Sequence, residues 1–449
     1  MLKYTCPSRI LRIGIPKVRL YTTTTPHTSP NGPGDGLPIP PTLLNKRKTE
    51  ARSSSDPLFT EETRQRLERL RRHQFHPTNI PDSPDFGTNQ YISIDEKLKQ
   101  QLKDIVSQFN APVRYAIAYG SGVFRQAGYD DQKKPMMDFI FGVSHPGHWH
   151  ALNMQQHPHH YSSIRFLGSG SVALLQEKVG AGLYFNPYVE MDGMTIKYGV
   201  VSIDKLCKDL IDWETLYVAG RMHKPVKILR DDARVRLANQ VNLTEAVRVA
   251  LLTLPERFNE AELFERIAGI SYTGDFRMIV GENPNKVRNI VQGQMDHFHR
   301  LYFGLLDDLP NVAILNNGQF QQNQNPRFRG LMVQKLPKTL YNKVVAEHRS
   351  QALRNNTDIP EDKIELHQQI AASPELSSYI DRGKEIFNLI TTFILNLAIL
   401  INPTPTTGLR DIIGRTALTQ SIKGVVTAGP WRTSRYAAEK LAKWWSAKK

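Results

Sequence analysis

The chain has 449 residues, of which 40% are hydrophobic and 22% charged, with a net charge of +15 and only two cysteines. This length allows two or three globular domains, and two cysteines exclude the disulfide framework of small secreted proteins. The basic balance favours polyanionic partners such as nucleotides, RNA or an anionic lipid surface.

The N-terminal 60 residues have the composition of targeting and linker segments. Residues 1–21 carry five basic and no acidic residues and precede four threonines, which predicts a mitochondrial transit peptide; a disordered basic tail is the alternative. Its removal would lower the net charge from +15 to about +10. Residues 22–60 are rich in Thr, Pro, Ser and Gly and predict a disordered linker, because this composition cannot bury a core.

The next segments predict a helix, a strand and a tight turn. Residues 94–109 carry their apolar side chains on one side, as in an amphipathic helix. Residues 115–119 alternate large and small apolar side chains, as in a half-buried strand. This strand breaks at Gly120-Ser121-Gly122, where the backbone can turn tightly and offer N–H groups and a hydroxyl to an anion.

A second strand-like run, residues 136–141, contains one carboxylate, Asp138. A charge inside such a run is costly unless it is paired, solvated in a cleft or bound to a metal. A divalent cation that carries a phosphate is a natural partner for it. Before this run, residues 123–126 are expected to begin a helix, whose positive dipole end would lie beside the Gly-Ser turn.

Two further stretches suggest ligand sites but have simpler structural interpretations. Six histidines lie between 145 and 160, but their spacing matches no standard zinc site. We expect a helix that begins near His148, with its histidines on the surface or packed on the core. Residues 168–171 read Gly-Ser-Gly-Ser, yet no strand with a carboxylate follows, which favours a loop or helix cap over a phosphate site.

Residues 183–201 predict two strands around an Asp192-Gly193 hairpin turn. Lys197 lies inside the second strand, where it either reaches solvent or points to the floor of a site. After a helical stretch at 203–220, Arg221 and Lys224 suit phosphate neutralisation. Capping of helix carbonyls and salt bridging would explain these two cations equally well.

Residues 241–306 have a helical pattern and predict a small helical domain, which we interpret as winged-helix-like. A winged helix can bind nucleic acid, but glutamates at 256, 260, 262 and 265 make its second helix acidic and would repel phosphates. We therefore expect no nucleic-acid partner. Residues 315–330 are rich in Gln and Asn and predict a loop.

The C-terminal region contains an apolar run and a basic, tryptophan-rich tail. Residues 386–401 are interrupted by Asn and Thr and are too short to span a membrane, which favours a buried helix. Residues 431–449 place tryptophans beside lysines, as in a short helix that rests on an anionic bilayer; docking on the protein's own core is the alternative. The residues that we assign to membrane contact are Trp431, Lys440, Trp444 and Trp445.

Several segments also carry a family resemblance. In chain order they read YGSGVFRQAGY, MMDFIFGV, IKYGVVSIDKLCKDL, LYVAGRMHKPVKIL, ISYTGDFRM with NPNKVRNIV, and SIKGVVTAGP. The strand, Gly-Ser turn and Asp-bearing strand resemble the nucleotidyltransferase superfamily. The whole set is similar to the mitochondrial translocator assembly and maintenance family, whose members are peripheral CDP-diacylglycerol synthases.

The resemblance implies a phosphatidate cytidylyltransferase that forms CDP-diacylglycerol and pyrophosphate from CTP and phosphatidic acid and feeds cardiolipin and phosphatidylglycerol synthesis. It implies Mg²⁺ as cofactor and a peripheral location on the anionic matrix face of the mitochondrial inner membrane. It also implies that Asp275 and Arg277 complete the cleft that contains Asp138. The implied catalytic residues are Asp138 (also the metal ligand), Ser121 and Lys197, and the implied nucleotide-binding residues are Gly120, Ser121, Gly122, Gln126, Lys197, Arg221 and Lys224.

One position departs from the superfamily pattern, which usually has two acids two residues apart on this strand, both on one face. The second position is Ile140, so a two-metal clamp is not visible. Either a more distant carboxylate substitutes or one metal bridged by substrate suffices. The candidate carboxylates are Glu190, Asp192, Asp204 and Asp209.

These signals together predict an α+β protein with a nucleotidyltransferase-like mixed sheet and flanking helices. We expect the nucleotidyltransferase domain at 61–235, the helical, winged-helix-like domain at 236–350 and a C-terminal helical region with the membrane-surface helix at 351–449. Two rival functions are an RNA-directed nucleotidyltransferase and a non-catalytic assembly factor for mitochondrial protein import. An intact Gly-Ser turn and Asp138 argue against the second, because a scaffold needs neither. The sequence does not determine the oligomeric state.

Overall fold

The computed structural model describes residues 85–127, 135–273, 275, 278, 283–307, 309, 311–315, 318–381 and 408–428, all within the compact unit Phe59–Lys449. The expected transit peptide (1–21), linker (22–60) and apolar run (386–401) lie outside the described residues, as do Trp431, Lys440, Trp444 and Trp445. Among the described helices, none is both long and apolar enough to cross a bilayer.

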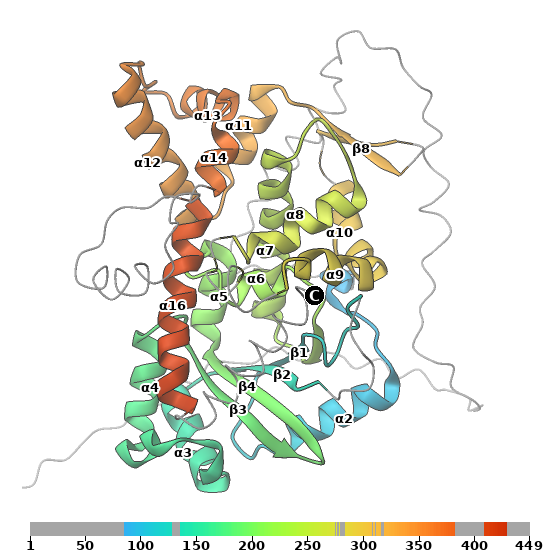
Figure 1. The fold of residues 1–449 in the computed structure, drawn as a ribbon, viewed down its shortest axis with the longest axis vertical. Helices are drawn as coiled ribbons and strands as arrows, with labels where there is room; N and C mark the ends of the chain where they lie inside the picture. The colour runs from blue at the N-terminus through green and yellow to red at the C-terminus, as the bar shows by residue number, and fades with distance from the viewer. Residues whose placement is uncertain are drawn as a thin grey trace, which may run out of the picture. The chain divides into compact units, whose positions relative to one another are not determined.

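The first part of the described chain contains a five-stranded mixed sheet in the order β3-β4-β2-β1-β5 (Figure 1). The central strand β2 pairs antiparallel with β1 and parallel with β4. Both strands predicted around the Gly-Ser turn are confirmed, and so is the hairpin at Asp192-Gly193, whose two residues have the positive φ angles that a two-residue hairpin turn requires. The strands are β1 Tyr115–Tyr119, β2 Met137–Val143, β3 Leu183–Met191, β4 Met194–Ser202 and β5 Lys227–Arg230.

Helices cover both faces of this sheet, because alternate residues of the buried strands belong to two different cores. Phe139, Phe141 and Tyr198 pack on one side with residues of α2 and α3. Ile117 and Ile140 pack on the other side with residues of α5 and of the helical region that follows. The helices of this part are α2 Glu96–Ser107, which confirms the amphipathic helix expected there, α3 Pro146–Gln156, α4 Gly168–Lys178, α5 Ile203–Asp212 and α6 Ala219–Met222.

One predicted helix and one predicted loop need correction. The stretch at 203–220 is not one helix, because α5 ends at Trp213, which adopts the left-handed conformation with φ 52°. The Gln/Asn-rich stretch at 315–330 is not only a loop, because it contains β8 and the start of α11. Residues 168–171 form the first turn of α4, in agreement with a helix start.

The second part has the element order expected for a winged-helix-like unit: a helix, a strand, helices and then two strands. Its strands form a three-stranded sheet in the order β6-β8-β7. The elements are α7 Ala233–Thr253, β6 Arg257–Asn259, α8 Glu260–Ile270, α9 Lys286–Gly293, α10 Met295–Asp307, β7 Val312–Ile314 and β8 Gln319–Gln322. The helices after them are α11 Pro326–Gln334, α12 Lys338–Asn355, α13 Lys363–Ala372, α14 Leu376–Asp381 and α16 Gly408–Ala428.

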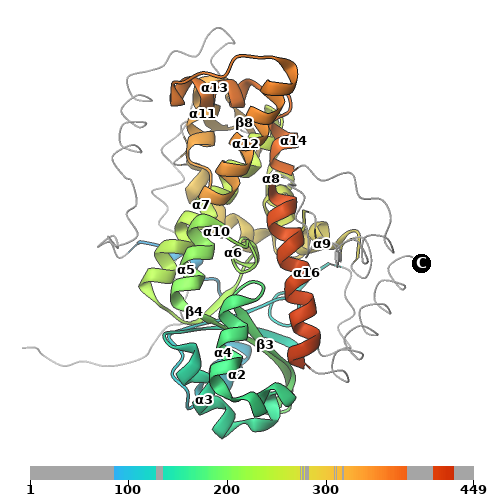
Figure 2. The same ribbon diagram turned by 90° about the vertical axis from the view of Figure 1, so that its left-hand side faces the viewer.

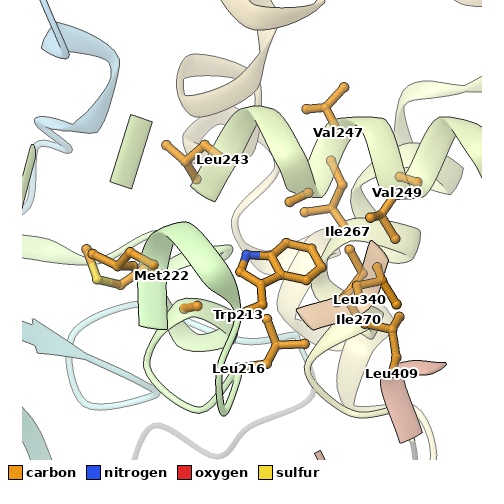
Figure 3. Packing of buried hydrophobic residues seen from close by; sticks show 14 of the residues in the cluster. Trp213, Leu216, Met222, Leu243, Val247, Val249, Ile267, Ile270, Leu340 and Leu409 are labelled. Atoms are coloured by element: carbon orange, nitrogen blue, oxygen red, sulfur yellow. The ribbon is translucent and has the colours of Figure 1, made fainter. Parts of the chain in front are cut away.

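Trp213 lies at the meeting point of these parts (Figure 3). Its side chain is fully buried, and its indole N–H donates to Asn242 Oδ1 at 2.9 Å. The surrounding cluster includes Leu243 of α7, Leu340 of α12 and Leu409 of α16. The core is therefore continuous across the limits expected at 235/236 and 350/351, which fall inside α7 and α12. The domain limits stay a prediction.

Two buried histidines predict that stability falls in acid. His150 bonds Tyr161 Oη and Gln176 Oε1, and His223 Nε2 bonds Asn242 Oδ1. Burial, the main cause, lowers the pKa of His150 to about 4 and that of His223 to about 3. Below pH 6.5 the unfolded chain binds protons that the native state excludes, so the free energy of unfolding falls by about 1.4 kcal/mol per pH unit for each histidine.

Urea unfolding at several pH values between 6.5 and 4.5 measures this slope. The variant His150→Gln should remove one histidine's share of it, since glutamine does not titrate. Buried Glu245, whose pKa is raised to about 7 mainly by burial, contributes a slope of opposite sign over this range. The prediction is therefore contradicted if His150→Gln and the unchanged protein have the same slope.

Candidate active site

The Gly-Ser-Gly turn follows β1 directly. Gly120 has φ 84°, a conformation that favours glycine, and its carbonyl accepts hydrogen bonds from the N–H groups of Val123 (3.1 Å) and Phe124 (3.0 Å). Within the described part of the chain, the N–H groups of Ser121 and Gly122 have no hydrogen-bond partner. The turn therefore presents two backbone donors, as an anion-binding turn requires.

The helix expected at 123–126 is not formed, because residues 121–127 are turn and irregular structure. This segment is instead attached to the helical region: the N–H of Ala127 donates to the carbonyl of Asn289 at 3.0 Å, and Gln294 Nε2 donates to the carbonyl of Arg125 at 3.1 Å. A helix dipole after the turn consequently plays no part in the site.

Asp138 faces this turn across the β1–β2 pair. In the sheet register it lies opposite Tyr119 on β1 and beside Lys197 on β4. A Cβ atom on Gly120 would come within 3.1 Å of Asp138 Oδ2, so the carboxylate lies directly against the turn. The Asp138 side chain is 24% exposed, which leaves it accessible from one side.

Lys197 is the charge partner of Asp138. Its Nζ lies 3.3 Å from Asp138 Oδ1 and 4.6 Å from the centre of the Phe185 ring. Because Ile140 and Val201 belong to the core on the α5 and α7 side, Asp138 and Lys197, an even number of residues away, project to the same side. Lys197 is thus directed into the site and does not lie on a solvated edge.

Arg221 extends the site from α6. Its guanidinium lies over the rings of Tyr119 (5.1 Å) and Tyr217 (4.7 Å), and its Nη2 donates to Tyr217 Oη at 3.0 Å. Stacking on two aromatic faces holds a guanidinium in a fixed orientation. Arg221 is therefore fixed against Tyr119, the β1 residue that lies opposite Asp138 in the sheet.

Lys224 and Lys286 flank the ring of Tyr272, with Nζ atoms 4.9 and 5.3 Å from its centre. Lys224 Nζ also donates to the Gly220 carbonyl (2.5 Å) and to Ser271 Oγ (2.6 Å). Burial lowers the pKa of Lys224 well below its usual range, and the charges of Arg221 and Lys286 lower it further. Cations gathered at this density favour an anionic ligand, which would relieve their repulsion.

Three buried polar atoms beside the turn have no hydrogen-bond partner among the described residues: Tyr119 Oη, Gln126 Oε1 and Arg221 Nε. Buried polar groups almost always have partners, so such a concentration needs an explanation. A polar ligand between the turn and α6 would supply the missing bonds.

Asp138 and Lys197 lie beside the turn, and Arg221 stacks on Tyr119, the residue before it. Lys224 lies instead against Tyr272, and Arg277 lies outside the described residues. Sequence reasoning did not select Lys286 or Tyr272, because only their presence in the ISYTGDFRM and NPNKVRNIV segments marked them. Asp275 is buried on the turn that follows Tyr272, and its N–H donates to the Tyr272 carbonyl.

The structure does not bring a second carboxylate of the expected set beside Asp138. Asp209 is buried and accepts hydrogen bonds from the N–H groups of four residues between 215 and 219. Glu190 accepts from Thr195 Oγ1 on the edge hairpin, and Asp204 pairs with Arg234. Asp192 bonds Gln108 at the hairpin tip. Ile140 is fully buried in the core, which favours the single-metal alternative.

The donor set fits Mg²⁺, which prefers oxygen ligands and is commonly held by one or two carboxylates plus substrate phosphates. Asp138 supplies an accessible carboxylate, and Ser121 adds a hydroxyl on the adjoining turn. The fit therefore depends on substrate oxygens to complete the coordination.

The histidine-rich segment has a different arrangement. Nitrogen atoms of His157, His159 and His160 lie within 4.8 Å of one another. However, the rings of His157 and His160 stack at 4.4 Å with 9° between their planes, and parallel stacked rings do not direct their in-plane lone pairs at one ion. His150 and His160 are buried, whereas His145, His148 and His159 are exposed. The segment therefore contains both of the expected arrangements, histidines packed on the core and histidines on the surface.

Comparison with known proteins identifies the family. The family described as "Phosphatidate cytidylyltransferase, mitochondrial" matches residues 102–443. Relatives with that name include those of Xenopus laevis (40% identical over 348 residues, 76% of this chain and 94% of the relative) and Schizosaccharomyces pombe (38% over 356 residues, 79% and 86%). The Saccharomyces cerevisiae relative is 46% identical over 236 residues, 51% of this chain and 60% of the relative. This chain therefore belongs to the mitochondrial phosphatidate cytidylyltransferase family.

Proposed function

We propose that this protein is a phosphatidate cytidylyltransferase, which makes CDP-diacylglycerol and pyrophosphate from CTP and phosphatidic acid. The observation that carries the proposal is the Asp138 carboxylate lying against Gly120 of the Gly-Ser-Gly turn, with Lys197 and Arg221 beside it. The name of the family and of its relatives supports the same reaction.

In this reaction a phosphate oxygen of phosphatidic acid attacks the α-phosphorus of CTP. The new P–O bond forms as the bond from the α-phosphorus to the bridging oxygen breaks, and pyrophosphate leaves with that oxygen. The acceptor phosphate is already largely ionised near neutral pH, so no side chain has to remove a proton. The protein's task is positioning and charge neutralisation.

The described residues divide this task. The N–H groups of Ser121 and Gly122 would cradle the leaving phosphates, and Lys197 and Arg221 would neutralise the charge that builds on them. Gln126 would bond the nucleotide with its unpartnered amide oxygen. Asp138 would hold Mg²⁺, which when bound neutralises triphosphate charge and polarises the phosphorus centre.

Lys286 should contribute to CTP binding through the anion site that it forms with Lys224. We expect Lys286→Gln to lower kcat/KM for CTP about tenfold at saturating phosphatidic acid, because it removes one charge-assisted contact worth about 1.4 kcal/mol. The matched control is Lys208→Gln, whose lysine is exposed and pairs with Glu214. Steady-state kinetics that are the same for both variants would remove Lys286 from the site.

The location of the enzyme follows the same proposal. We place it on the matrix face of the inner membrane as a peripheral protein, imported by the transit peptide at 1–21. The tail with Trp431, Lys440, Trp444 and Trp445 would contact the anionic surface. A phosphatidate substrate in the bilayer supports this location, because the enzyme must reach a lipid headgroup.

A reconstitution tests the proposed function against its rivals. Purified protein is incubated with labelled CTP and Mg²⁺, and with either phosphatidate-containing vesicles or an RNA primer. We expect label in CDP-diacylglycerol only. Label in extended RNA would favour the RNA-directed nucleotidyltransferase. If the protein neither turned over nor bound CTP, the result would favour a non-catalytic assembly factor.

A further inference from the structure

We propose that the 3₁₀ helix η4 (Ser163–Leu167) and α4 together form a membrane-contact surface that rests on an anionic bilayer. The surface consists of Phe166, Leu167 and Leu174, which are 78%, 69% and 61% exposed. Large apolar side chains that are more than half exposed are otherwise rare among the described residues, and a cluster of them indicates an interaction site.

The local structure holds these side chains outward. Gly168, with φ 82°, turns the chain from η4 into α4, and the two elements pack on each other. Leu174 lies on the exposed side of α4, two residues after the buried Val172. The opposite side of α4 is buried: Val172 packs in a small core with Tyr184 of β3. Because that buried face fixes the rotation of α4, the apolar face stays directed away from the protein.

The charges around this surface fit an anionic bilayer. The guanidinium of Arg165 lies 4.9 Å from the centre of the Phe166 ring, and Lys178 is exposed in the last turn of α4. Apolar side chains bordered by cations bind at the boundary between acyl chains and anionic headgroups. The nearby acid, Glu177, bonds Gln176 Nε2.

The course of α16 supports the same occupant. In α16, Lys423 Nζ donates to the carbonyls of Gln176 (3.1 Å) and Val179 (2.7 Å), at the C-terminal end of α4. Figure 2 shows α16 running down to α4. The helix ends at Ala428, three residues before Trp431, where the tail predicted to bind membrane begins. Helix α16 therefore contacts the end of α4 that carries the exposed Lys178.

This inference rests on the proposed function, because a lipid acceptor gives the protein a reason to lie on a bilayer. The surface and the reacting groups share one strand, β3. Helix α4 packs on β3 through Val172 and Tyr184, and the next residue, Phe185, contacts Lys197 on the opposite face of the sheet. A bilayer bound at α4 would consequently lie across this strand from the reacting groups.

Flotation on vesicles tests the surface without any catalysis. The full chain with Phe166→Asp and Leu174→Asp is mixed with phosphatidylglycerol vesicles that contain neither CTP nor phosphatidic acid. We expect the vesicle-bound fraction to fall at least about fivefold. Two apolar side chains that would insert into the bilayer are replaced by carboxylates, which the anionic headgroups repel. The control Leu353→Asp, at a 77% exposed position of α12, should bind as the unchanged protein does.

Turnover on a dispersed short-chain phosphatidic acid should stay within about twofold of the unchanged protein, since no bilayer is involved. Flotation equal to that of the unchanged protein would overturn the inference. The same result is expected if the tail at 429–449, and not a bilayer, is the partner of the surface. Loss of turnover on the dispersed substrate would overturn it as well, because it would indicate a structural role. Failure of the proposed function would instead appear as no turnover in the unchanged protein, whatever the flotation result.

Discussion

Replacing Asp138 with asparagine is expected to lower turnover by at least about a thousandfold while the fold remains intact. Asparagine keeps the shape of the side chain but loses the charge that binds a cation, and metal assistance at a phosphoryl centre is worth several kcal/mol. The variant also removes the negative charge that lies 3.3 Å from Lys197 Nζ. The measurement is the rate of CDP-diacylglycerol formation at saturating CTP and Mg²⁺.

The thermal midpoint should change little in this variant, because Asp138 is partly exposed and lies at the start of β2. Asp204→Asn is the matched control, since Asp204 is exposed and pairs with Arg234 at a distance from the turn. Asp138→Asn with normal turnover would remove the assignment of Asp138 as the metal ligand.

Gly120→Ala is expected to lower turnover about tenfold or more. The added Cβ would lie 3.1 Å from Asp138 Oδ2, so the carboxylate has to move by a few tenths of an ångström, and a displacement of about 1 Å at a reacting centre can cost a factor of about 100. Alanine at φ 84° also destabilises the fold by about 1–2 kcal/mol.

Gly193→Ala separates these two effects. Gly193 has φ 71° in the β3–β4 hairpin, and a Cβ there would meet no atom within 4 Å. It therefore shares the backbone penalty but does not touch the site. If both variants lost the same amount of turnover, the close approach between the turn and Asp138 would have no catalytic importance.

The strands of the site could be predicted from the sequence because their signals are local. A short apolar run that ends at a Gly-Ser turn predicts a strand and its end. The Asp192-Gly193 pair predicts a two-residue hairpin turn. Asp138 was predicted to face the turn because the strand before the turn and the strand that carries Asp138 were expected to lie side by side. In the structure β1 and β2 pair, with Tyr119 opposite Asp138.

The helix expected after the turn was wrong because tertiary contacts determine the path of residues 121–127. A Cβ on Gly293 of α9 would come within 2.9 Å of Gln126, so this segment packs tightly against a helix about 170 residues later in the chain. Lys286 and Tyr272 were missed for the same reason: their approach to Lys224 depends on how the helical region folds back, and no local pattern encodes it.

The most direct test of the central claim is the binding of CTP with Mn²⁺ in place of Mg²⁺, followed by electron paramagnetic resonance of the bound ion. The claim is that the Asp138 carboxylate and the Gly-Ser-Gly turn together receive a metal-bound nucleotide. We expect the unchanged protein to bind Mn²⁺ tightly only when CTP is present and Asp138→Asn to lose that CTP-dependent signal. Equal CTP-dependent binding of Mn²⁺ by both proteins would contradict the account.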